Sequence, residues 1–568
     1  MNQKLEDSFE LALGVTPEER EKSDDLNVGY DAEEETWELI VKYSGDIERL
    51  RSNTIRIETL YGGYAIVRLL ERELESFSNQ PEVEYIEQPK RLYFEVYEGR
   101  YASCIPQVQS PPYSLSGEGT IVAAVDSGVD YTHPDFCNED GTTRILKLWD
   151  QGVPDGVYDS ARINEALAAK TPEERYRIVP SMDTGGHGTA VLGIAAGNGR
   201  ASRGENKAVA TRSNLIVVKM GTSGVRDFPR TTELLRGVDF CVRQAIEYKM
   251  PLALNLSFGN SYGSHDGTSL VETYLDNISQ AGKTTIIVAT GNEGGKRRHT
   301  SGQVNADNGN LIEMAIGEGE RNLSLQIWKN YVDEYEIRLI APSGNSVVIS
   351  ETPGNIYKSR LDNTVLMWIF GTPTPYSSRQ EIYLEMIPDG NRKDIQSGIW
   401  KIVLAPKKIV LGEFEMWLPA GGAIGEETGF LVSVPKTTLT IPSTAARVIS
   451  VGAYNARTES MATFSGWGPL ANNMQKPDLV APGVDILAPA VGGYYSIFSG
   501  TSMAAPFVTG SVSLLNEWGI VRGNDPYLYG EKAKAYLVKG ARQLPGFRDW
   551  PNAQAGWGAL CLADSIPR

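Results

Sequence analysis

The sequence lacks a long hydrophobic run, an excess of basic residues and a dense set of cysteines. Its 568 residues contain no apolar stretch of the ~18 residues that a membrane-spanning helix needs, which argues against insertion into a membrane. The formal net charge is −17, from 71 acidic and 54 basic residues. A protein that binds the phosphate backbone needs a basic excess to displace counterions, so we expect no nucleic-acid partner.

The few cysteines and histidines argue against several kinds of site. The four cysteines lie far apart and form no CxxC pair, which predicts free thiols rather than a disulfide framework: Cys104, Cys137, Cys241 and Cys561. No His/Cys cluster of the kind that binds zinc is present, and no glycine-rich nucleotide motif follows a predicted strand. We therefore expect no cofactor. The oxygen-rich loop at residues 135–141 is an alternative calcium site, but its spacing is not that of an EF-hand, which favours a solvated acidic loop.

The N-terminus also lacks a targeting pattern. It reads MNQKLEDSFELALG, with no basic segment followed by an apolar run, so no classical secretory signal is visible. Synthesis in the cytoplasm is the expectation that follows.

The first hundred residues form a distinct part of the chain. They hold 24 acidic and 12 basic residues, a net charge of −12, which leaves −5 for the remaining 468 residues. Strand patterns at 37–43, 54–60 and 64–69, a helix pattern at 71–78 and extended pieces at 83–88 and 92–96 predict a small α+β unit. A segment rich in Pro, Ser and Gly at 103–119 is typical of a linker.

The remainder of the chain follows a different pattern. Apolar runs at 120–125, 215–220, 252–257 and 285–290 alternate with helix patterns at 188–196, 231–248 and 268–281, which predicts a parallel α/β sheet. Short β patterns separated by PSGN and PDGN fill residues 310–435 and predict an inserted all-β sandwich. The α/β pattern resumes at 446–453 and in a helix from Ser502.

Four short segments at the ends of predicted core elements could carry chemistry. Asp126 ends an apolar strand, His187 lies among glycines at the start of a helix, Asn292 follows a strand, and Ser502 opens a helix. Each has an ordinary structural interpretation: a turn Asp, a capping or core His, a turn Asn and a Ser N-cap.

Together these side chains supply every part that acyl transfer needs. A serine hydroxyl requires an adjacent base, which His187 can be, and that base requires a buried carboxylate, which Asp126 can be. Asn292 and the backbone N–H of Ser502 can stabilise the oxyanion of a tetrahedral intermediate. The residues occur in the order Asp, His, Ser.

Five segments resemble the motifs of the subtilisin-like serine proteases, the subtilases of peptidase family S8: AAVDSGVDYTHPDF, GGHGTAVLGIAAG, NLSFG, ATGNEG and SGTSMAAPFVTG. The resemblance covers about residues 115–300 and 440–568. It implies a triad of Asp126, His187 and Ser502, with Asn292 as oxyanion donor. It also implies a substrate channel at Ser257, Phe258 and Gly259, where an extended peptide pairs as a β-strand.

The accessory parts resemble the clostridial spore-germination Csp proteases. LNVGYDAEEETWELIVKYSGD and the β insert carry this likeness, and the insert separates Asn292 from Ser502 by 210 residues. The resemblance implies a pro-domain at 1–100, which assists folding and then inhibits the site. A catalytic domain follows at 101–300 and 441–568, with a jelly-roll-like insert at 301–440. It further implies a partner that is a peptide or protein, the pro-domain held as an intramolecular or cleaved partner, and a spore-associated protease that activates a cortex-lytic zymogen.

Three alternatives remain open at the level of sequence. We predict one self-cleavage within residues 97–104, for which the alternative is a simple interdomain linker. A general degradative subtilase is an alternative to the germination role. A pro-domain that occludes the site permanently would make the chain a non-enzymatic regulator.

Overall fold

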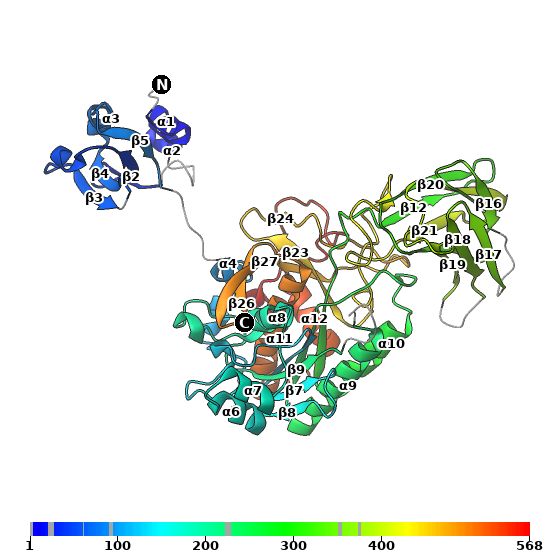
Figure 1. The fold of residues 1–568 in the computed structure, drawn as a ribbon. Helices are drawn as coiled ribbons and strands as arrows, with labels where there is room; N and C mark the ends of the chain where they lie inside the picture. The colour runs from blue at the N-terminus through cyan, green and yellow to red at the C-terminus, as the bar shows by residue number, and fades with distance from the viewer. Residues whose placement is uncertain are drawn as a thin grey trace. The chain divides into compact units, whose positions relative to one another are not determined.

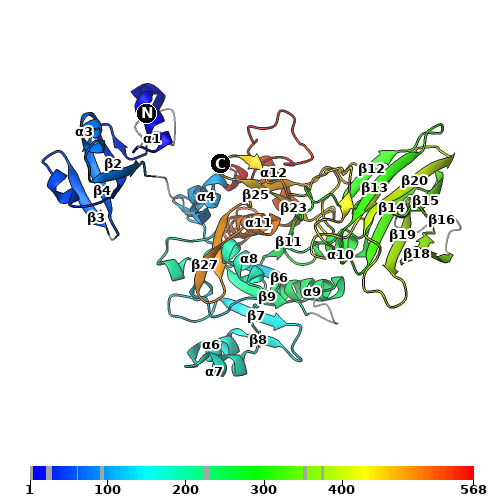
Figure 2. The same ribbon diagram turned by 45° about the horizontal axis from the view of Figure 1, so that its top comes forward.

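The computed structural model describes residues 4–20, 28–60, 62–89, 95–221, 229–349, 355–372 and 377–567. Contacts divide the chain into two compact units, Met1–Phe94 and Glu95–Arg568. Figures 1 and 2 show both units as ribbons.

The N-terminal unit is a small antiparallel sheet with short helices. Alternating residues of its long strand, Trp37, Leu39 and Val41, are buried in the core of this unit, as the period of two in the sequence predicts. The strands pair in the order β1-β2-β4-β3, and β5 also pairs with β2, along Ile40–Tyr43. The elements are α1 (Asp7–Gly14), α2 (Pro17–Arg20), β1 (Tyr30–Asp31), β2 (Thr36–Tyr43), β3 (Arg56–Leu60), β4 (Tyr64–Leu70), α3 (Leu74–Ser78) and β5 (Val83–Glu87).

The second unit contains a mostly parallel sheet, which confirms the expected α/β fold. Its order is β24-β23-β11-β10-β6-β9-β7-β8, with β25 beside β23. The pairs β10–β11, β10–β6, β6–β9 and β11–β23 are parallel. The strands are β6 (Ile121–Asp126), β7 (Ile145–Asp150), β8 (Val157–Asp159), β9 (Asn214–Lys219), β10 (Leu252–Leu256), β11 (Thr284–Ala289), β23 (Ile449–Asn455), β24 (Ser460–Met461) and β25 (Leu479–Pro482).

Helices cover both faces of this sheet. α8 (His187–Ala196) and α11 (Thr501–Asn516) share one apolar core with the sheet, and α9 (Thr231–Tyr248) and α10 (Leu270–Ile278) share another. Because both faces are covered, β6, β10 and β11 are buried along their whole length, which accounts for their unbroken apolar sequences. The remaining elements are α6 (Ser160–Ala168), α7 (Pro172–Ile178), the hairpin β26 (Ile486–Ala490) and β27 (Tyr494–Phe498), α12 (Gly530–Lys539) and α13 (Leu562–Ser565).

The expected β insert consists of two antiparallel sheets. Their orders are β12-β21-β14-β19-β18-β17 and β16-β15-β20-β13-β22, and their inward side chains form one shared core. The strands are β12 (His299–Gln303), β13 (Asn310–Ile316), β14 (Leu323–Asn330), β15 (Glu334–Ile340), β16 (Ser346–Ile349), β17 (Ile356–Leu361), β18 (Thr364–Phe370), β19 (Arg379–Pro388), β20 (Gly398–Lys408), β21 (Glu413–Trp417) and β22 (Gly429–Phe430). The four-part division of the chain and the jelly-roll topology stay predictions.

The segment expected to be a linker is instead partly helical. It begins directly after α4 (Glu95–Ala102) and contains α5 (Ile105–Gln109), in which Ile105 and Val108 are fully buried. Pro106 lies in the first turn of α5, where a missing N–H removes no helical hydrogen bond. Of the extended piece expected at 92–96, residues 92–94 lie outside the described residues and the last two begin α4.

The prediction of four free thiols is wrong for two of them. Cys104 and Cys561 form a disulfide across 457 residues, whereas Cys137 and Cys241 are free and buried. The fold brings the first pair together because the segment before α5 lies against the C-terminal segment, where Leu562 N donates to the Ser103 carbonyl at 2.9 Å. Cysteine spacing along the chain carries no signal of that contact.

No helix among the described residues has both the length and the apolar character needed to cross a membrane.

Candidate active site

The carboxyl ends of neighbouring parallel strands place three of the predicted site segments along one edge of the sheet. β6 ends at Asp126, β10 ends just before Ser257, and β11 ends just before the segment that carries Asn292. Their registers align Val125 with Leu256 and Leu256 with Val288, so these ends lie level with one another. This edge is where open α/β sheets place their ligands.

Asp126 is fully buried and bonded to the predicted base. Its Oδ1 lies 2.7 Å from His187 Nδ1 and accepts the backbone N–H of Ser127 at 2.7 Å. A carboxylate at Nδ1 holds the imidazole in the tautomer with Nδ1 protonated and Nε2 free to accept a proton.

The glycines beside His187 allow α8 to begin against the Asp126 strand. Gly186, which precedes the helix, has a φ of 71°, a left-handed conformation that favours glycine. A Cβ on Gly188 would overlap the carbonyl oxygen of Gly128, so glycine permits the close approach. The His187 side chain itself is 35% exposed, which leaves the imidazole accessible to a substrate.

The surroundings of His187 favour its protonated form. Burial alone lowers the pKa of the imidazole, but the charge and hydrogen bond of Asp126 and the charge of Asp183 together outweigh that effect. The His187 pKa therefore lies above its ordinary value.

Ser502 is the second residue of α11, two positions after the glycine N-cap Gly500. Its hydroxyl donates to the backbone carbonyl of Ser257 at 3.3 Å, and the structure records no hydrogen bond from it to His187 among the described residues. Both side chains lie near the segment predicted to form the substrate channel, because the His187 ring lies 5.8 Å from the ring of Phe258, next to Ser257.

Pro506 has an identifiable structural role beside Ser502. In a regular helix the N–H of residue 506 would bond to the carbonyl of residue 502, and proline has no N–H. That carbonyl instead accepts the Ser257 hydroxyl at 3.4 Å. The proline therefore leaves the Ser502 carbonyl free to join α11 to the segment after β10.

Asn292 is exposed and held in one orientation. Its Oδ1 accepts the backbone N–H of Thr501 at 3.0 Å and the Thr501 hydroxyl at 3.1 Å. The side-chain NH₂ is consequently on the other branch of the amide and free to donate. A Cβ placed on Gly500 would lie 3.5 Å from that nitrogen and 3.8 Å from the Ser502 nitrogen, so the two N–H donors flank one point.

Two residues that the sequence analysis did not single out hold this arrangement together. Asp183 is buried and accepts from Ser127 Oγ, Gly186 N and Thr189 N, each at 2.9 Å. Thr501 orients Asn292, as described above. An Asp shortly before a helix start is a recognisable capping signal, whereas nothing in the sequence indicates that Thr501 contacts Asn292.

The predicted substrate channel borders a cavity of about 470 Å³. Phe258 and Gly259 line it from the segment after β10, and Leu234 lines it from α9. Ala420 and Gly421, which follow β21 of the insert, line another wall. The insert therefore contributes directly to the surface beside the predicted channel.

In the loop considered for calcium, the carboxylates accept hydrogen bonds from other groups of the protein. Asp135 accepts the Tyr495 hydroxyl at 2.7 Å and the Ala201 N–H at 2.8 Å, and Asp140 accepts the Thr142 hydroxyl at 2.6 Å. The described residues contain no group of three or more His, Cys, Asp or Glu side chains placed to hold a metal ion.

Comparison with known proteins finds two family models along the chain. The model described as the subtilase family matches residues 117–365 and 423–558. The model described as the Csp protease B prodomain matches residues 3–90.

Individual proteases are also similar to this chain. The structure of the Clostridium perfringens CspB protease is 37% identical in sequence, with a TM-score of 0.77, and the match covers 83% of this chain and 96% of that one. The PI-type proteinase of Lactococcus lactis subsp. cremoris is 25% identical over 74% of this chain and 24% of its own length. The minor extracellular protease Vpr of Bacillus subtilis (strain 168) is 25% identical over 71% of this chain and 46% of its own length. The chain thus spans about a quarter of the lactococcal relative and about half of Vpr.

Proposed function

Because the chain belongs to the subtilase family of serine proteases and carries a Csp-type prodomain, we propose that it is an endopeptidase with Asp126, His187 and Ser502 as its triad. The observation that carries this proposal is the 2.7 Å contact between the buried Asp126 carboxylate and His187, at the start of a helix that shares its core with the helix that carries Ser502.

The proposed reaction begins with a rotation of the Ser502 side chain. The hydroxyl leaves the Ser257 carbonyl and donates to His187 Nε2, a contact that tightens when substrate binds. His187 takes the proton as Ser502 Oγ attacks the peptide carbonyl carbon. Asn292 Nδ2 and the Ser502 N–H stabilise the resulting oxyanion.

The intermediate then collapses to an acyl-enzyme. His187 gives its proton to the leaving amine as the C–N bond breaks, and the carbonyl carbon stays bonded to Ser502 Oγ. A water molecule, deprotonated by His187, attacks the ester carbonyl carbon, and His187 returns the proton to Ser502 Oγ as the C–O bond breaks and the acid is released. Asp126 stabilises the imidazolium in both steps and keeps its charge throughout.

The direct test is Ser502→Ala. We expect the variant to lose peptide cleavage and labelling by a fluorophosphonate, whereas Ser343→Ala, at an exposed position in the insert, keeps both. Wild-type chain that never labels would favour the permanently occluded, non-enzymatic alternative. Full activity of Ser502→Ala would remove Ser502 from the mechanism.

We also propose one self-cleavage within residues 97–104. A subtilase channel takes up an extended chain, but these residues form the end of α4 and the turn before α5, with Gly99 packed on the Phe507 ring. The end of α4 must therefore be unwound while this segment occupies the channel. Intact mass should show two fragments for wild type and one uncut chain for Ser502→Ala; an uncut chain in active protein would contradict the proposal.

The prodomain and the likeness to CspB support a role in spore germination, with the zymogen of a cortex-lytic enzyme as substrate and the spore as location. The alternative is a general degradative protease. A single cut in such a purified zymogen, with little hydrolysis of denatured casein, would support the first role. Extensive casein hydrolysis with no cut in the zymogen would support the second.

A further inference from the structure

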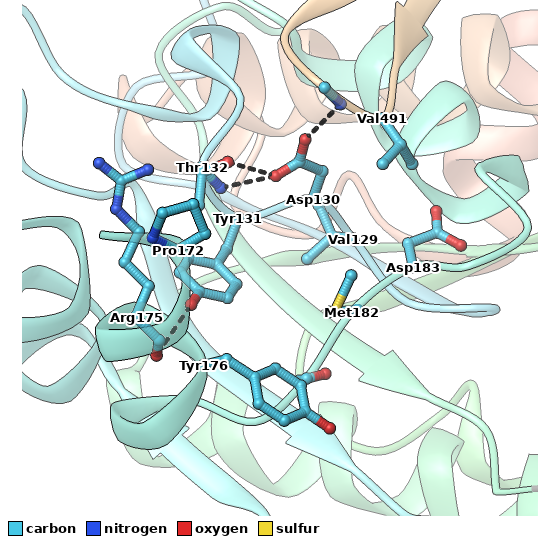
Figure 3. A pocket seen from close by; sticks show the side chains of 12 residues that line it. Val129, Asp130, Tyr131, Thr132, Pro172, Arg175, Tyr176, Met182, Asp183 and Val491 are labelled. Carbon is cyan, nitrogen blue, oxygen red and sulfur yellow. Dashed lines mark hydrogen bonds between the residues drawn. The ribbon is translucent and has the colours of Figure 1, made fainter. Parts of the chain in front are cut away.

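A second cavity is lined in part by residues four to six positions before the predicted catalytic histidine, and it shares no lining residue with the cavity beside the predicted channel. It has a volume of about 250 Å³. Its walls come from the segment after β6, from α7, from the segment before α8 and from the tip of the β26–β27 hairpin, as Figure 3 shows. That volume is below the ~300–1,000 Å³ typical of pockets for whole small molecules. It suits one amino-acid side chain.

The side chains that line this cavity are mainly apolar. The rings of Tyr131 and Tyr176, together with Val129, Met182 and Val491, surround the space (Figure 3). Tyr176 and Met182 are 51% and 54% exposed, which is a large solvent-facing area for apolar side chains placed side by side at a rim.

The carboxylates that border the cavity already have partners. Asp130 accepts the Thr132 hydroxyl at 2.6 Å and the Gly492 N–H at 2.8 Å. Asp183 accepts the N–H groups of Gly186 and Thr189, as described above. Both carboxylates accept hydrogen bonds from the protein, and Arg175, which also lines the cavity, repels a second cation, so the cavity favours an apolar side chain over a basic one.

One wall of the cavity lies close in space to the residue that precedes His187. A Cβ on Gly186, the residue before His187, would lie 3.6 Å from Val491 Cγ2, so this wall begins one residue from the imidazole. The hairpin that supplies Val491 leads through β27 directly to Ser502.

The chemistry of the reaction says which part of a substrate would reach this cavity. We place the acyl part of the peptide along the predicted channel Ser257–Gly259, because the Ser502 hydroxyl, which would carry the acyl group, lies 3.3 Å from the Ser257 carbonyl. The leaving amine must receive its proton from His187, so the leaving segment starts at the imidazole. The 250 Å³ cavity borders the loop that precedes α8, on the other face of the sheet from α9.

We propose that this cavity is a specificity subsite for one apolar side chain, of the Leu, Met, Phe or Tyr class, in the substrate segment C-terminal to the scissile bond. The assignment rests on the proposed endopeptidase function. It identifies a determinant of cleavage specificity that comes from α7 and the β26–β27 hairpin.

Product profiling over a broad range of peptide sequences tests the assignment. The full-length protein is incubated with a mixture of peptides derived from a whole proteome, and mass spectrometry reads the residues on both sides of every cut. We expect one position among the first few after the cut to be enriched in Leu, Met, Phe or Tyr. In Tyr176→Ala/Met182→Ala that enrichment should fall at least about tenfold.

Internal controls separate this proposal from the function on which it rests. Preferences on the acyl side should be unchanged in the double variant, and Tyr527→Ala, at a 72% exposed position, should keep both profiles. No apolar enrichment after the cut, or enrichment that persists in the double variant, would overturn the subsite. Wild type that makes no cuts beyond those of Ser502→Ala would overturn the endopeptidase function itself.

Discussion

At the scale of single residues, Asp183 links the acid strand to the helix that carries His187. It accepts the Ser127 hydroxyl, and Ser127 directly follows Asp126. It also accepts two N–H groups of the segment that opens α8. The same charge is one of the influences that raise the His187 pKa. Asp183 is therefore a positioning residue with an electrostatic effect on the base.

The pH dependence of cleavage should report this effect. The reaction needs neutral His187, so a raised pKa means that kcat/KM falls as pH drops through a midpoint above the ordinary value of 6.5. Asp183→Asn should move that midpoint to lower pH, because it removes a charge that stabilises the imidazolium. The control Asp140→Asn, at an exposed loop position, should leave the profile in place. A shift of the midpoint to higher pH in Asp183→Asn would contradict this account.

The oxyanion donor gives a second prediction at this scale. Asn292→Leu should lower kcat by about 10²–10³ with little change in KM, because the lost hydrogen bond forms mainly in the transition state. Thr501→Val should lower kcat less, since it removes one of the two bonds that orient the Asn292 amide. Thr501→Ser restores the hydroxyl and should recover the rate. Equal losses in Thr501→Val and Thr501→Ser would indicate a packing role instead.

At the scale of elements, α8 begins at His187, α11 begins one residue before Ser502, and the two helices pack closely. A Cβ on Gly510 of α11 would lie 2.6 Å from the carbonyl oxygen of Ala195 in α8 and 2.5 Å from Val209 Cβ. Backbone and β-carbon atoms cannot rotate away, so glycine sets the distance between the two helices. The positions of His187 and Ser502 depend on that distance.

Gly510→Ala should therefore destabilise the protein. Alanine improves helix propensity by up to about 1 kcal/mol, but overpacking against rigid atoms costs about 1–3 kcal/mol or more. We expect a lower midpoint in urea unfolding followed by circular dichroism. Gly546→Ala is the matched control, because its added methyl group meets no atom within 4 Å. A midpoint for Gly510→Ala at or above that of wild type would refute the close-packing argument.

At the scale of the whole molecule, the disulfide joins the start of the second unit to its C-terminal segment. Cys104 and Cys561 close a loop of 457 residues. Such a crosslink typically stabilises a fold by about 2–4 kcal/mol, and it would also keep the new chain end attached after self-cleavage before Cys104.

Thiol titration of the denatured protein checks this crosslink. We expect two reactive thiols without reductant, from Cys137 and Cys241, and four after reduction. Cys104→Ser should show three without reductant, because Cys561 is released, while Cys241→Ser should show one. Four thiols in unreduced wild type would mean that the disulfide does not form in solution.

A stack of three rings joins the β insert to the parallel-sheet part of the same unit. Trp417 of β21 lies between His265, in the loop after β10, and His299 of β12, with ring centroids 4.3 and 4.8 Å away. Burial lowers the pKa of His265 to about 4 and that of His299 to about 3. Both imidazoles are therefore neutral in the folded protein above those values.

Mild acid should weaken this junction. The unfolded histidines bind protons below about pH 6.5, whereas the folded ones do so only near pH 3–4, so stability is lost as pH falls from 6.5 toward 4. The loss should be smaller in His265→Phe/His299→Phe. Unfolding midpoints measured between pH 7 and pH 4 by tryptophan fluorescence test this, and an identical slope in both proteins would contradict it.

The sequence alone determined the class of fold and the identity of the proposed triad. Period-two patterns and unbroken apolar runs predicted β2, β6, β9, β10 and β11 to within a few residues, because local burial leaves its mark on local composition. Asp126, His187, Asn292 and Ser502 were recognisable because each lies in a short motif beside its element.

Tertiary structure decided what depends on contacts between distant segments. The Cys104–Cys561 bond, the Thr501–Asn292 contact and the two cavities beside His187 arise from chain segments that are far apart in sequence. The Ser502 hydroxyl donates to the Ser257 carbonyl, and no sequence motif predicts this hydrogen bond. Such features depend on which elements pack against each other in the folded protein. The sequence pattern reports only local burial and local hydrogen bonding, so it does not predict contacts between distant segments.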